Sequence, residues 1–270
     1  MSMRVFILGN GKVGRGLGRA LRKAGWSVEV RAARAGVPTK AITSALLILA
    51  VRDAELTRFC TELAERRLVG RRTACVHVAG ALGPEALAPL RAVSAGVAQM
   101  HPMISFADPD VLPSLVRGNL HVAGDPVAVR RARAVGRALG MAPRTIPGLD
   151  RIGYHAAAGL VANGAAALAA MGAALLVRSG VTAEEAPRML GPLLRSVADN
   201  VEALGFPAAL TGPVRRGDAG AVAKHLRLIG ERLPEAVPLF VAAARAQLPL
   251  ARALPDASAE ALDAVEKALR

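Results

Sequence analysis

Hydrophobic and polar positions divide the chain into two parts with different periodicities. In the first part, short apolar runs alternate with helical patterns. The runs that predict strands are Val5–Leu8, Val28–Val30, Ala45–Val51, Ala74–Val78, Val97–Met100 and Leu120–Ala123. Helical patterns lie between them, as at Asp53–Leu68, Pro84–Arg91 and Val127–Leu139. Because Ala45–Val51 is apolar throughout rather than alternating, it indicates a parallel strand buried on both faces. We expect a doubly wound, mostly parallel α/β sheet.

After Pro143–Gly148 the pattern becomes helical only. The predicted helices are Asp150–Arg178, Ala183–Leu204, Ala219–Leu233, Glu235–Leu248 and Ala257–Leu269. We therefore divide the chain into an α/β domain, residues 1–147, and an all-α C-terminal domain, residues 148–270.

One helical segment, Ile152–Val177, carries no charged residue and is long enough to span a bilayer. It consists mostly of alanine and glycine and contains Tyr154, His155 and Asn163, with few of the large apolar residues that drive insertion. We expect a fully buried helix of a soluble protein and no membrane association. A homodimer interface is the natural way to bury it.

Three glycines stand between the first strand and the first helix. Gly9, Gly11 and Gly14 form a G-x-G-x-x-G pattern inside a β-α-β unit of about 30 residues, the fingerprint of dinucleotide binding. The predicted cofactor-binding residues of this loop are Gly9, Asn10, Gly11, Lys12, Val13 and Gly14. The alternative is a plain strand-turn-helix with glycines at the cap.

The end of the second strand indicates which nicotinamide dinucleotide binds. An acidic residue there holds the ribose of NAD, whereas a basic one suits the 2′-phosphate of NADP. Glu29 falls inside the strand, and the strand end is expected at Arg31, with Arg34 three residues later. Two guanidinium groups favour NADP, with NAD as the alternative. These arginines could instead only cover the adenine or the surface.

Composition limits the other functional classes. The net charge is +14, but the arginines are scattered and aromatic residues are 3% of the chain, so no specific nucleic-acid binding is expected. Cys60 and Cys75 have neither metal-ligand spacing nor a disulfide framework, and the chain begins directly with a strand rather than a signal peptide. We expect a reduced, cytoplasmic protein without a metal site.

The motifs resemble a known superfamily. Gly9–Gly14, then Leu49–Asp53, then a helical second domain are similar to the 6-phosphogluconate-dehydrogenase-like reductases, which include pyrroline-5-carboxylate and ketopantoate reductases. Most of these carry proline where Arg52 stands. Further segments resemble one branch, the Rossmann-like proteins with a C-terminal domain of unknown function. They are His77–Gly83, His101–Phe106, Tyr154–Ala157, Asn163, Leu210–Asp218 and His225. That branch usually has serine where Ala79 stands.

The resemblance implies a Rossmann dinucleotide-binding domain and a helical substrate and dimerisation domain. It also implies that the long helix carries a polar pair, often lysine and asparagine, for substrate and proton. This chain lacks the lysine, and His155 is the candidate to replace it beside Asn163.

Further candidates lie at the carboxyl ends of the strands, where ligands of such sheets bind. Ala50, Val51, Arg52 and Gly80 are expected beside the cofactor, and His101 is a candidate for orienting the substrate or transferring a proton. Candidates for substrate binding are Tyr154, Thr211, Arg216, Asp218 and His225. Each has a structural alternative: His101 as a turn residue, His155 and Asn163 as polar groups bonded across the core, Asp218 as a helix cap.

These residues together predict an NADPH-dependent reductase of a small carboxylate-bearing carbonyl compound or imine, with a ketopantoate-like 2-oxo acid as the first candidate and a cyclic imine as the second. His155 or His101 would supply the proton, and Arg216 with Asn163 would hold the carboxylate. The alternative is a dinucleotide-binding sensor or scaffold without hydride transfer.

Overall fold

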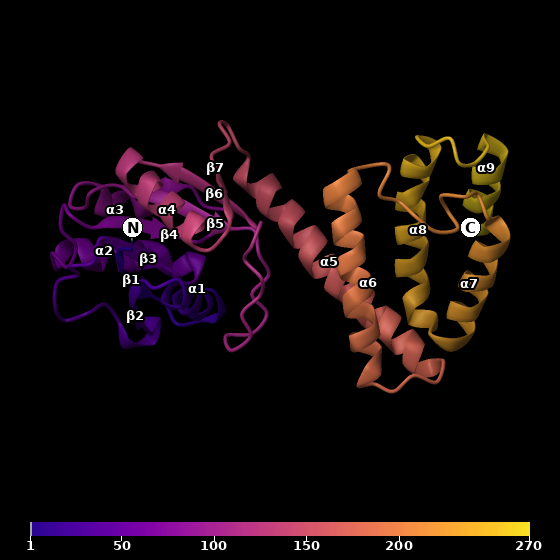
Figure 1. Cartoon of the computed structure of the whole chain (residues 1–270), viewed down its shortest axis with the longest axis horizontal. Coiled ribbons are helices and arrows are strands. Elements are labelled where there is room, and N and C mark those ends of the chain that lie inside the picture. Colours follow the sequence, from indigo (N-terminus) through magenta and orange to yellow (C-terminus); the bar gives the residue numbers. More distant parts are fainter. Residues whose placement is uncertain (1) are drawn as a thin grey trace. The chain divides into compact units, whose positions relative to one another are not determined.

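The computed structural model describes residues 2–270, which form two compact units, residues 1–159 and 160–270 (Figure 1). The units divide inside the long helix α5 (Arg151–Arg178) rather than at the boundary expected near residue 147. The physical reason is that the first turn of α5 packs onto the sheet, where the ring of Tyr154 lies edge-on to that of His101.

The first unit holds a seven-stranded sheet with the order β2-β1-β3-β4-β5-β6-β7. The strands are β1 (Arg4–Leu8), β2 (Ser27–Arg31), β3 (Leu46–Leu49), β4 (Ala74–His77), β5 (Val97–Pro102), β6 (Asn119–Gly124) and β7 (Ala142–Arg144). The first five run parallel. The predicted α/β domain with a mostly parallel sheet is therefore confirmed.

Two features of this sheet were not predicted from the sequence pattern. Strand β6 pairs antiparallel with β5, and β7 adds a short edge strand beside β6. Strand β7 has only three residues, one of them Pro143, so it presents no apolar run to detect. Proline is tolerated there because an edge strand need not donate every ladder hydrogen bond.

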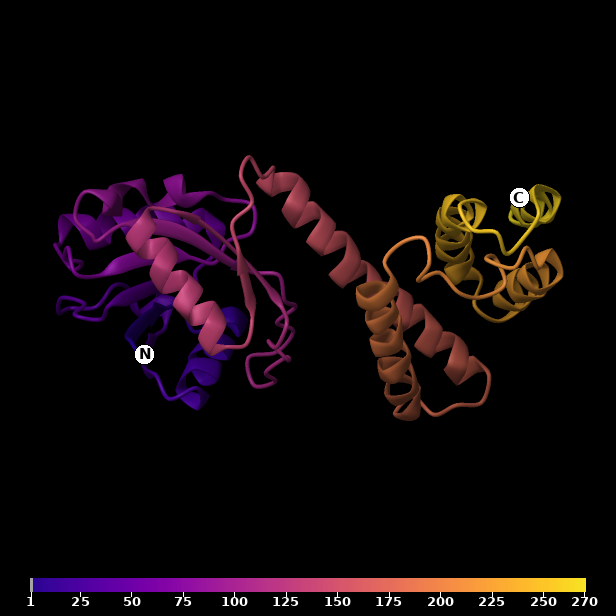
Figure 2. The same cartoon turned by 45° about the horizontal axis from the view of Figure 1, so that its top comes forward.

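Both faces of the sheet are covered, which explains the continuous apolar runs. Val5 and Ile7 pack toward α1 (Lys12–Lys23) and α4 (Pro126–Ala138), whereas Phe6 and Leu8 pack toward α2 (Leu56–Glu65) and α3 (Ala88–Arg91). Figure 2 shows α4 crossing one face of the sheet, over β4, β5 and β6. Alternate side chains of one strand thus enter two separate cores.

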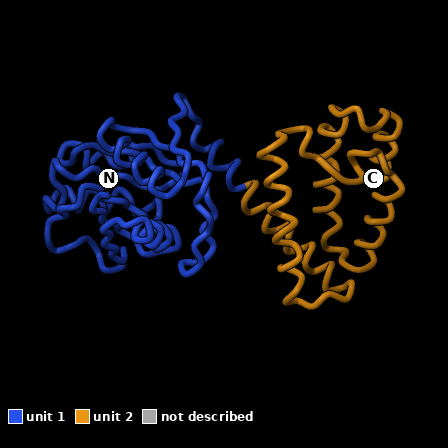
Figure 3. Tube along the Cα trace, in the orientation of Figure 1, with its two compact units in different colours: residues 1–159 blue, residues 160–270 orange. Residues whose placement is uncertain are grey.

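The second unit is helical, as predicted (Figure 3). After the C-terminal part of α5 come α6 (Glu185–Leu204), α7 (Ala219–Arg232), α8 (Val237–Arg252) and α9 (Ala259–Ala268). Val222 of α7, Leu248 of α8 and Val265 of α9 meet in its main core.

The expectation that α5 is fully buried is wrong for the single chain. None of its residues is buried, and Leu160 and Val161 are 77% and 71% exposed. Within the described residues α5 is also the one helix long and apolar enough to cross a membrane by length and composition. An apolar sequence indicates that a helix must be shielded from water, but it does not identify the surface that covers the helix.

Candidate functional site

In the glycine loop, backbone atoms of different segments pack directly against one another. Gly9 has φ of +118°, and a Cβ there would lie 2.1 Å from the carbonyl oxygen of Ala50. A Cβ at Gly14 would lie 2.0 Å from the carbonyl oxygen of Gly9. The first and third glycines of the motif are therefore required by backbone contacts within the fold.

Gly11 differs, because nothing lies within 4 Å of the position its Cβ would take. It precedes α1, whose N-terminus has no side-chain cap and no acidic residue in its first turn. The first N–H groups of this helix are thus free to bind an anion, and the helix dipole favours one there. Exposed Asn10 and Lys12 flank this open space. The loop fits the pyrophosphate of a dinucleotide.

The loop after β3 lies beside the glycine loop. The Ala50 N–H donates to the Leu8 carbonyl (2.8 Å), which continues the pairing of β3 with β1. Val51 is half-buried and Arg52 is exposed where a 3-10 turn begins. Strand β1 lies between β2 and β3, so the order in which the chain adds strands to the sheet reverses at this point. Ligands of open α/β sheets bind at such reversals.

The second strand ends at Arg31, as predicted, and Glu29 pairs with Phe6 in mid-strand. The Arg31 guanidinium donates to the carbonyls of Ala35 (2.6 Å) and Gly36 (2.8 Å), so it holds the turn after β2 together. Arg34 is exposed on that turn and has no hydrogen-bond or ion-pair partner within residues 2–270. It is therefore the guanidinium available to a phosphate.

Four of the five histidines gather at one edge of the sheet. His77 ends β4, His101 and His121 face each other across β5 and β6, and His155 lies on the first turn of α5. The rings of His101 and His155 are edge-on, with centroids 5.8 Å apart. Within residues 2–270, no cluster of His, Cys, Asp and Glu side chains is arranged to hold a metal ion.

Gly80 allows two of these rings to converge. A Cβ at Gly80 would lie 2.3 Å from His155 Nδ1 and 2.8 Å from His101 Nε2. The exposed His155 and the nearly buried His101 (9% exposed) therefore present ring nitrogens over the same backbone position. The structure brings together three of the predicted residues here, His101, His155 and Gly80. Tyr154 joins them, with its hydroxyl 3.4 Å from His101 Nδ1.

Burial favours the uncharged forms of the buried histidines, His77, His101 and His121. Desolvation, reinforced by the neighbouring histidines, lowers the pKa of His101 to about 4, and burial also lowers the pKa of His77 and His121. Burial raises the pKa of Tyr154, which keeps its proton. At neutral pH, His101 is therefore a neutral imidazole that can orient a polar group through its single N–H but lacks the acidic second proton of an imidazolium.

His77, a residue not predicted to act in the site, shapes the backbone beside it. Its Nδ1 accepts from the Ala79 N–H (3.2 Å), so its Nε2–H donates to the Gly83 carbonyl (2.9 Å). The imidazole bridges the two ends of the segment that contains Gly80.

Sequence reasoning also missed Gln99 and Arg151. Gln99 is fully buried in β5 and bonds to Ala79 and Gly80 on one side and to His121 and Arg151 on the other. The available signal was an amide inside the apolar run of β5, because a buried polar group needs partners.

Of the candidates in the second unit discussed next, Asp218 has a structural role and the others are exposed. Asp218 caps α7 by accepting from the Ala221 N–H (2.9 Å), which confirms its structural alternative. Thr211 and Arg216 are exposed, and so is Asn163, which makes no hydrogen bond to the described chain. Their roles toward a substrate stay predictions.

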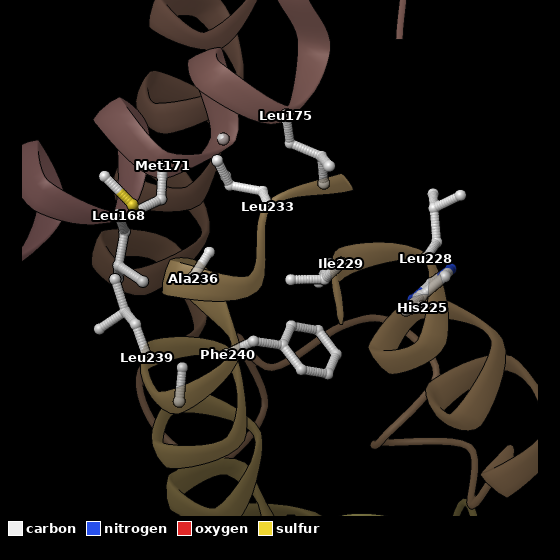
Figure 4. Close-up of a pocket in the computed structure, with 12 residues that line it drawn as sticks. Leu168, Met171, Leu175, His225, Leu228, Ile229, Leu233, Ala236, Leu239 and Phe240 are labelled. Atoms are coloured by element: carbon white, nitrogen blue, oxygen red, sulfur yellow. The ribbon is translucent and has the colours of Figure 1, made fainter. Parts of the chain in front are cut away.

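His225 lines an apolar cavity of about 400 Å³ between α5, α7 and α8 (Figure 4). Leu168, Met171, Ile229 and Phe240 are among its other lining residues. His225 is the one imidazole of that lining, so the cavity suits apolar groups rather than a charged substrate.

The glycine loop gives a test that separates folding from binding. We expect Gly14→Ala to destabilise the protein by about 1–3 kcal/mol, because its methyl group would meet the Gly9 carbonyl. Gly11→Ala should leave the melting temperature unchanged and weaken NADPH binding, because its methyl group enters the open space. Thermal melts and NADPH fluorescence titrations measure the two effects, and equal NADPH affinity in Gly11→Ala and wild type would contradict the assignment.

The pKa of His101 predicts how stability depends on pH. Because its folded pKa of about 4 lies below its ordinary value of 6.5, the unfolded chain binds more protons between these values. The stabilisation is complete above pH 6.5 and is lost as pH falls toward 4, with a loss of about 3 kcal/mol from this residue. Urea unfolding at pH 7 and pH 5 should show the decline, and His101→Asn should reduce it. An unchanged pH dependence of stability in His101→Asn would contradict its assignment to His101.

Comparison with solved structures shows the fold. A candidate NADP oxidoreductase from Bacteroides fragilis superposes with a TM-score of 0.71 at 18% identity, over 91% of this chain and 98% of the other. Pyrroline carboxylate reductase from Plasmodium falciparum, solved with NADP bound, gives 0.62 at 11% identity, over 99% and 98%. An imine reductase variant from Myxococcus stipitatus, in complex with NAD⁺, gives 0.55 at 17% identity, over the full length of both chains.

Comparison of the sequence with curated proteins found no match. Two family models match adjacent parts of the chain. Residues 1–102 match the Rossmann-like domain, and residues 119–247 match a domain of unknown function, DUF2520. The chain therefore combines a Rossmann-like domain with a DUF2520 C-terminal domain.

Proposed function

We propose that the protein is an NADPH-dependent reductase of a small carboxylate-bearing carbonyl compound or imine. The observation that carries the proposal is the open space at Gly11 beneath the uncapped N-terminus of α1, on the sheet edge that also carries the histidine cluster. The names of the structural neighbours, an NADP oxidoreductase, a pyrroline carboxylate reductase and an imine reductase, support the same reaction class.

A bound nicotinamide would supply the hydride. The chain itself would position the substrate and provide the proton. In this proposal His101, neutral through burial, uses Nε2 to orient the reacting oxygen or nitrogen above Gly80. His155 is the proposed proton donor, because it is exposed and its Nδ1 reaches the same position. Tyr154 fixes the His101 ring from the other side through its hydroxyl.

NADP is the proposed cofactor, and Arg34 rather than Arg31 is the proposed contact to its 2′-phosphate. Two of the guanidinium nitrogens of Arg31 already donate hydrogen bonds to the turn after β2, whereas Arg34 is exposed on that turn. No acidic residue stands at the end of β2 to hold the ribose of NAD. The arginine suits a phosphate because its planar fork binds oxyanions with two hydrogen bonds.

A sensor or scaffold that binds the dinucleotide without hydride transfer is the competing function. The long helix has no lysine at the position where related reductases carry one, and Ala79 offers no hydroxyl beside Gly80. Binding without turnover is the property that separates it from the reductase.

The experiment is an NADPH oxidation assay with a panel of 2-oxo acids and cyclic imines, followed by loss of absorbance at the nicotinamide band. We expect turnover with at least one member and a large loss of kcat in His155→Ala. Arg34→Ala should weaken NADPH binding by about tenfold or more, from the loss of a charge-assisted contact, and leave NADH binding unchanged.

Exposed Arg58, on α2 and paired with Glu55, is the matched control arginine. Arg58→Ala should change neither affinity. Tight NADPH binding without turnover on any substrate would favour the sensor, and equal effects of Arg34→Ala on NADPH and NADH would exclude the phosphate contact.

We also propose that the protein is a homodimer that buries α5 and α6. Leu160 and Val161 of α5 and Met189, Leu193 and Val197 of α6 are each at least 50% exposed in the single chain. Monomeric soluble proteins rarely expose apolar surface on this scale. A second copy of α5, which is rich in alanine and glycine, offers a matching surface for close packing.

Sedimentation velocity tests the dimer. Wild type should sediment as a dimer, and Leu160→Asp with Leu193→Asp should yield monomers, because each charge would be buried at the interface. Val111→Asp is the matched control, since Val111 is 67% exposed in the first unit, outside these helices. A stable wild-type monomer, or recovery of the protein in the membrane fraction, would contradict the proposal.

A further inference from the structure

The Gln99 side chain has only one possible orientation. Its Nε2 lies 2.9 Å from the Ala79 carbonyl and 3.1 Å from the Gly80 carbonyl, and carbonyls only accept hydrogen bonds. Both N–H groups of the amide are therefore used there. Its Oε1 must face the other way, where His121 Nδ1 and Arg151 Nε each lie at 3.2 Å.

This orientation determines how Arg151 is held. The guanidinium donates through Nε to Gln99, and its two terminal nitrogens have no hydrogen-bond or ion-pair partner within residues 2–270. Arg151 is half-buried and opens α5, the helix end where the dipole disfavours a cation. The chain thus fixes a guanidinium in place and leaves its terminal donors to something else.

His121 carries a second unsatisfied group in the same network. Because Oε1 of Gln99 only accepts, His121 must donate from Nδ1–H, and its Nε2 is a bare acceptor in the neutral ring. The residue is 2% exposed, and Nε2 has no partner among the described residues. A buried acceptor without a donor is rare in folded proteins and points to a group that the chain does not supply.

We propose that Arg151, positioned by Gln99, binds the carboxylate of the substrate, the role that the sequence suggested for Arg216. The inference rests on the reductase proposed above and names the anion-binding residue of that site. The planar guanidinium matches the two oxygens of a carboxylate, and its Nε anchor leaves the terminal nitrogens for a bidentate contact. A hydroxyl or N–H of the same ligand, or a water molecule held with it, would satisfy His121 Nε2.

Arg151 has three advantages over Arg216 in this role. Its orientation is determined by a fully buried amide, whereas Arg216 is exposed and has no orienting hydrogen bond to the described residues. It bonds to the same Gln99 oxygen as His121, and the other end of that amide bonds to Gly80. The two candidate histidines converge over Gly80. Its positive charge also acts on the neighbouring imidazoles, since it contributes to the lowered pKa of His121.

The test uses oxalate as the probe and does not depend on turnover. Binding is measured by calorimetry on wild type, Arg151→Gln, Arg151→Lys, Gln99→Leu and Arg216→Gln, each checked for folding by its thermal melt. We expect Arg151→Gln to bind oxalate about tenfold more weakly or worse, Arg151→Lys to fall between, and Arg216→Gln to match wild type. Gln99→Leu should weaken binding although the guanidinium remains.

Nitrogen-15 spectra of the labelled histidines give a readout that a purely structural role would not move. Oxalate should raise the pKa of His121 in wild type, because it neutralises Arg151, and should not do so in Arg151→Gln. In Gln99→Leu, the His121 ring should lose its preference for the Nδ1–H tautomer.

Three results would overturn the inference: no oxalate binding by wild type at millimolar concentration, unchanged binding in folded Arg151→Gln, or loss of binding in Arg216→Gln instead. Oxalate binding that depends on Arg151, in a protein that never oxidises NADPH, would support the inference and remove the reductase proposal. The two proposals therefore fail on different measurements.

Discussion

The close contact of three backbone segments at Gly9, Ala50 and Gly14 is the constraint on which the candidate site depends. At this point β1 turns into α1, and β3 ends beside it. Any side chain at Gly9 or Gly14 would push these segments apart, and the left-handed φ of Gly9 adds strain for other residues. Because the contact leaves no room for side chains, the N-terminus of α1 lies at the sheet edge with its N–H groups free.

A second close approach, at Gly80, organises the other part of the site. The missing side chain there lets His101 and His155 place ring nitrogens over the same backbone atom. Burial decides the protonation of His101 and Tyr154, since desolvation keeps His101 neutral and keeps the proton on Tyr154. The buried amide of Gln99 links this position to Arg151, so polar groups on two strands and one helix act as one network.

Helix α5 contributes to both units and illustrates a limit of hydrophobicity as a signal. Its first turn carries Arg151, Tyr154 and His155 against the sheet, while the rest of the helix is apolar and not buried by the chain itself. A helix that is apolar all round must be covered by other surface. The requirement follows from the sequence, whereas the covering surface is the second copy of the chain proposed above.

Local periodicity and residues adjacent in the chain were enough to predict the parallel strands, the succession of helices in the second half and the glycine loop. The sequence also located His101, His155 and Gly80. It could not place Gln99, His121 or Arg151, which are 22 and 30 residues apart along the chain and meet only when β5, β6 and α5 come together. Nor could it separate the arginine that holds a turn, Arg31, from one that is free, Arg34. These points depend on the folded chain, because hydrogen-bond partners and burial arise from contacts between distant segments, which the local sequence pattern does not encode.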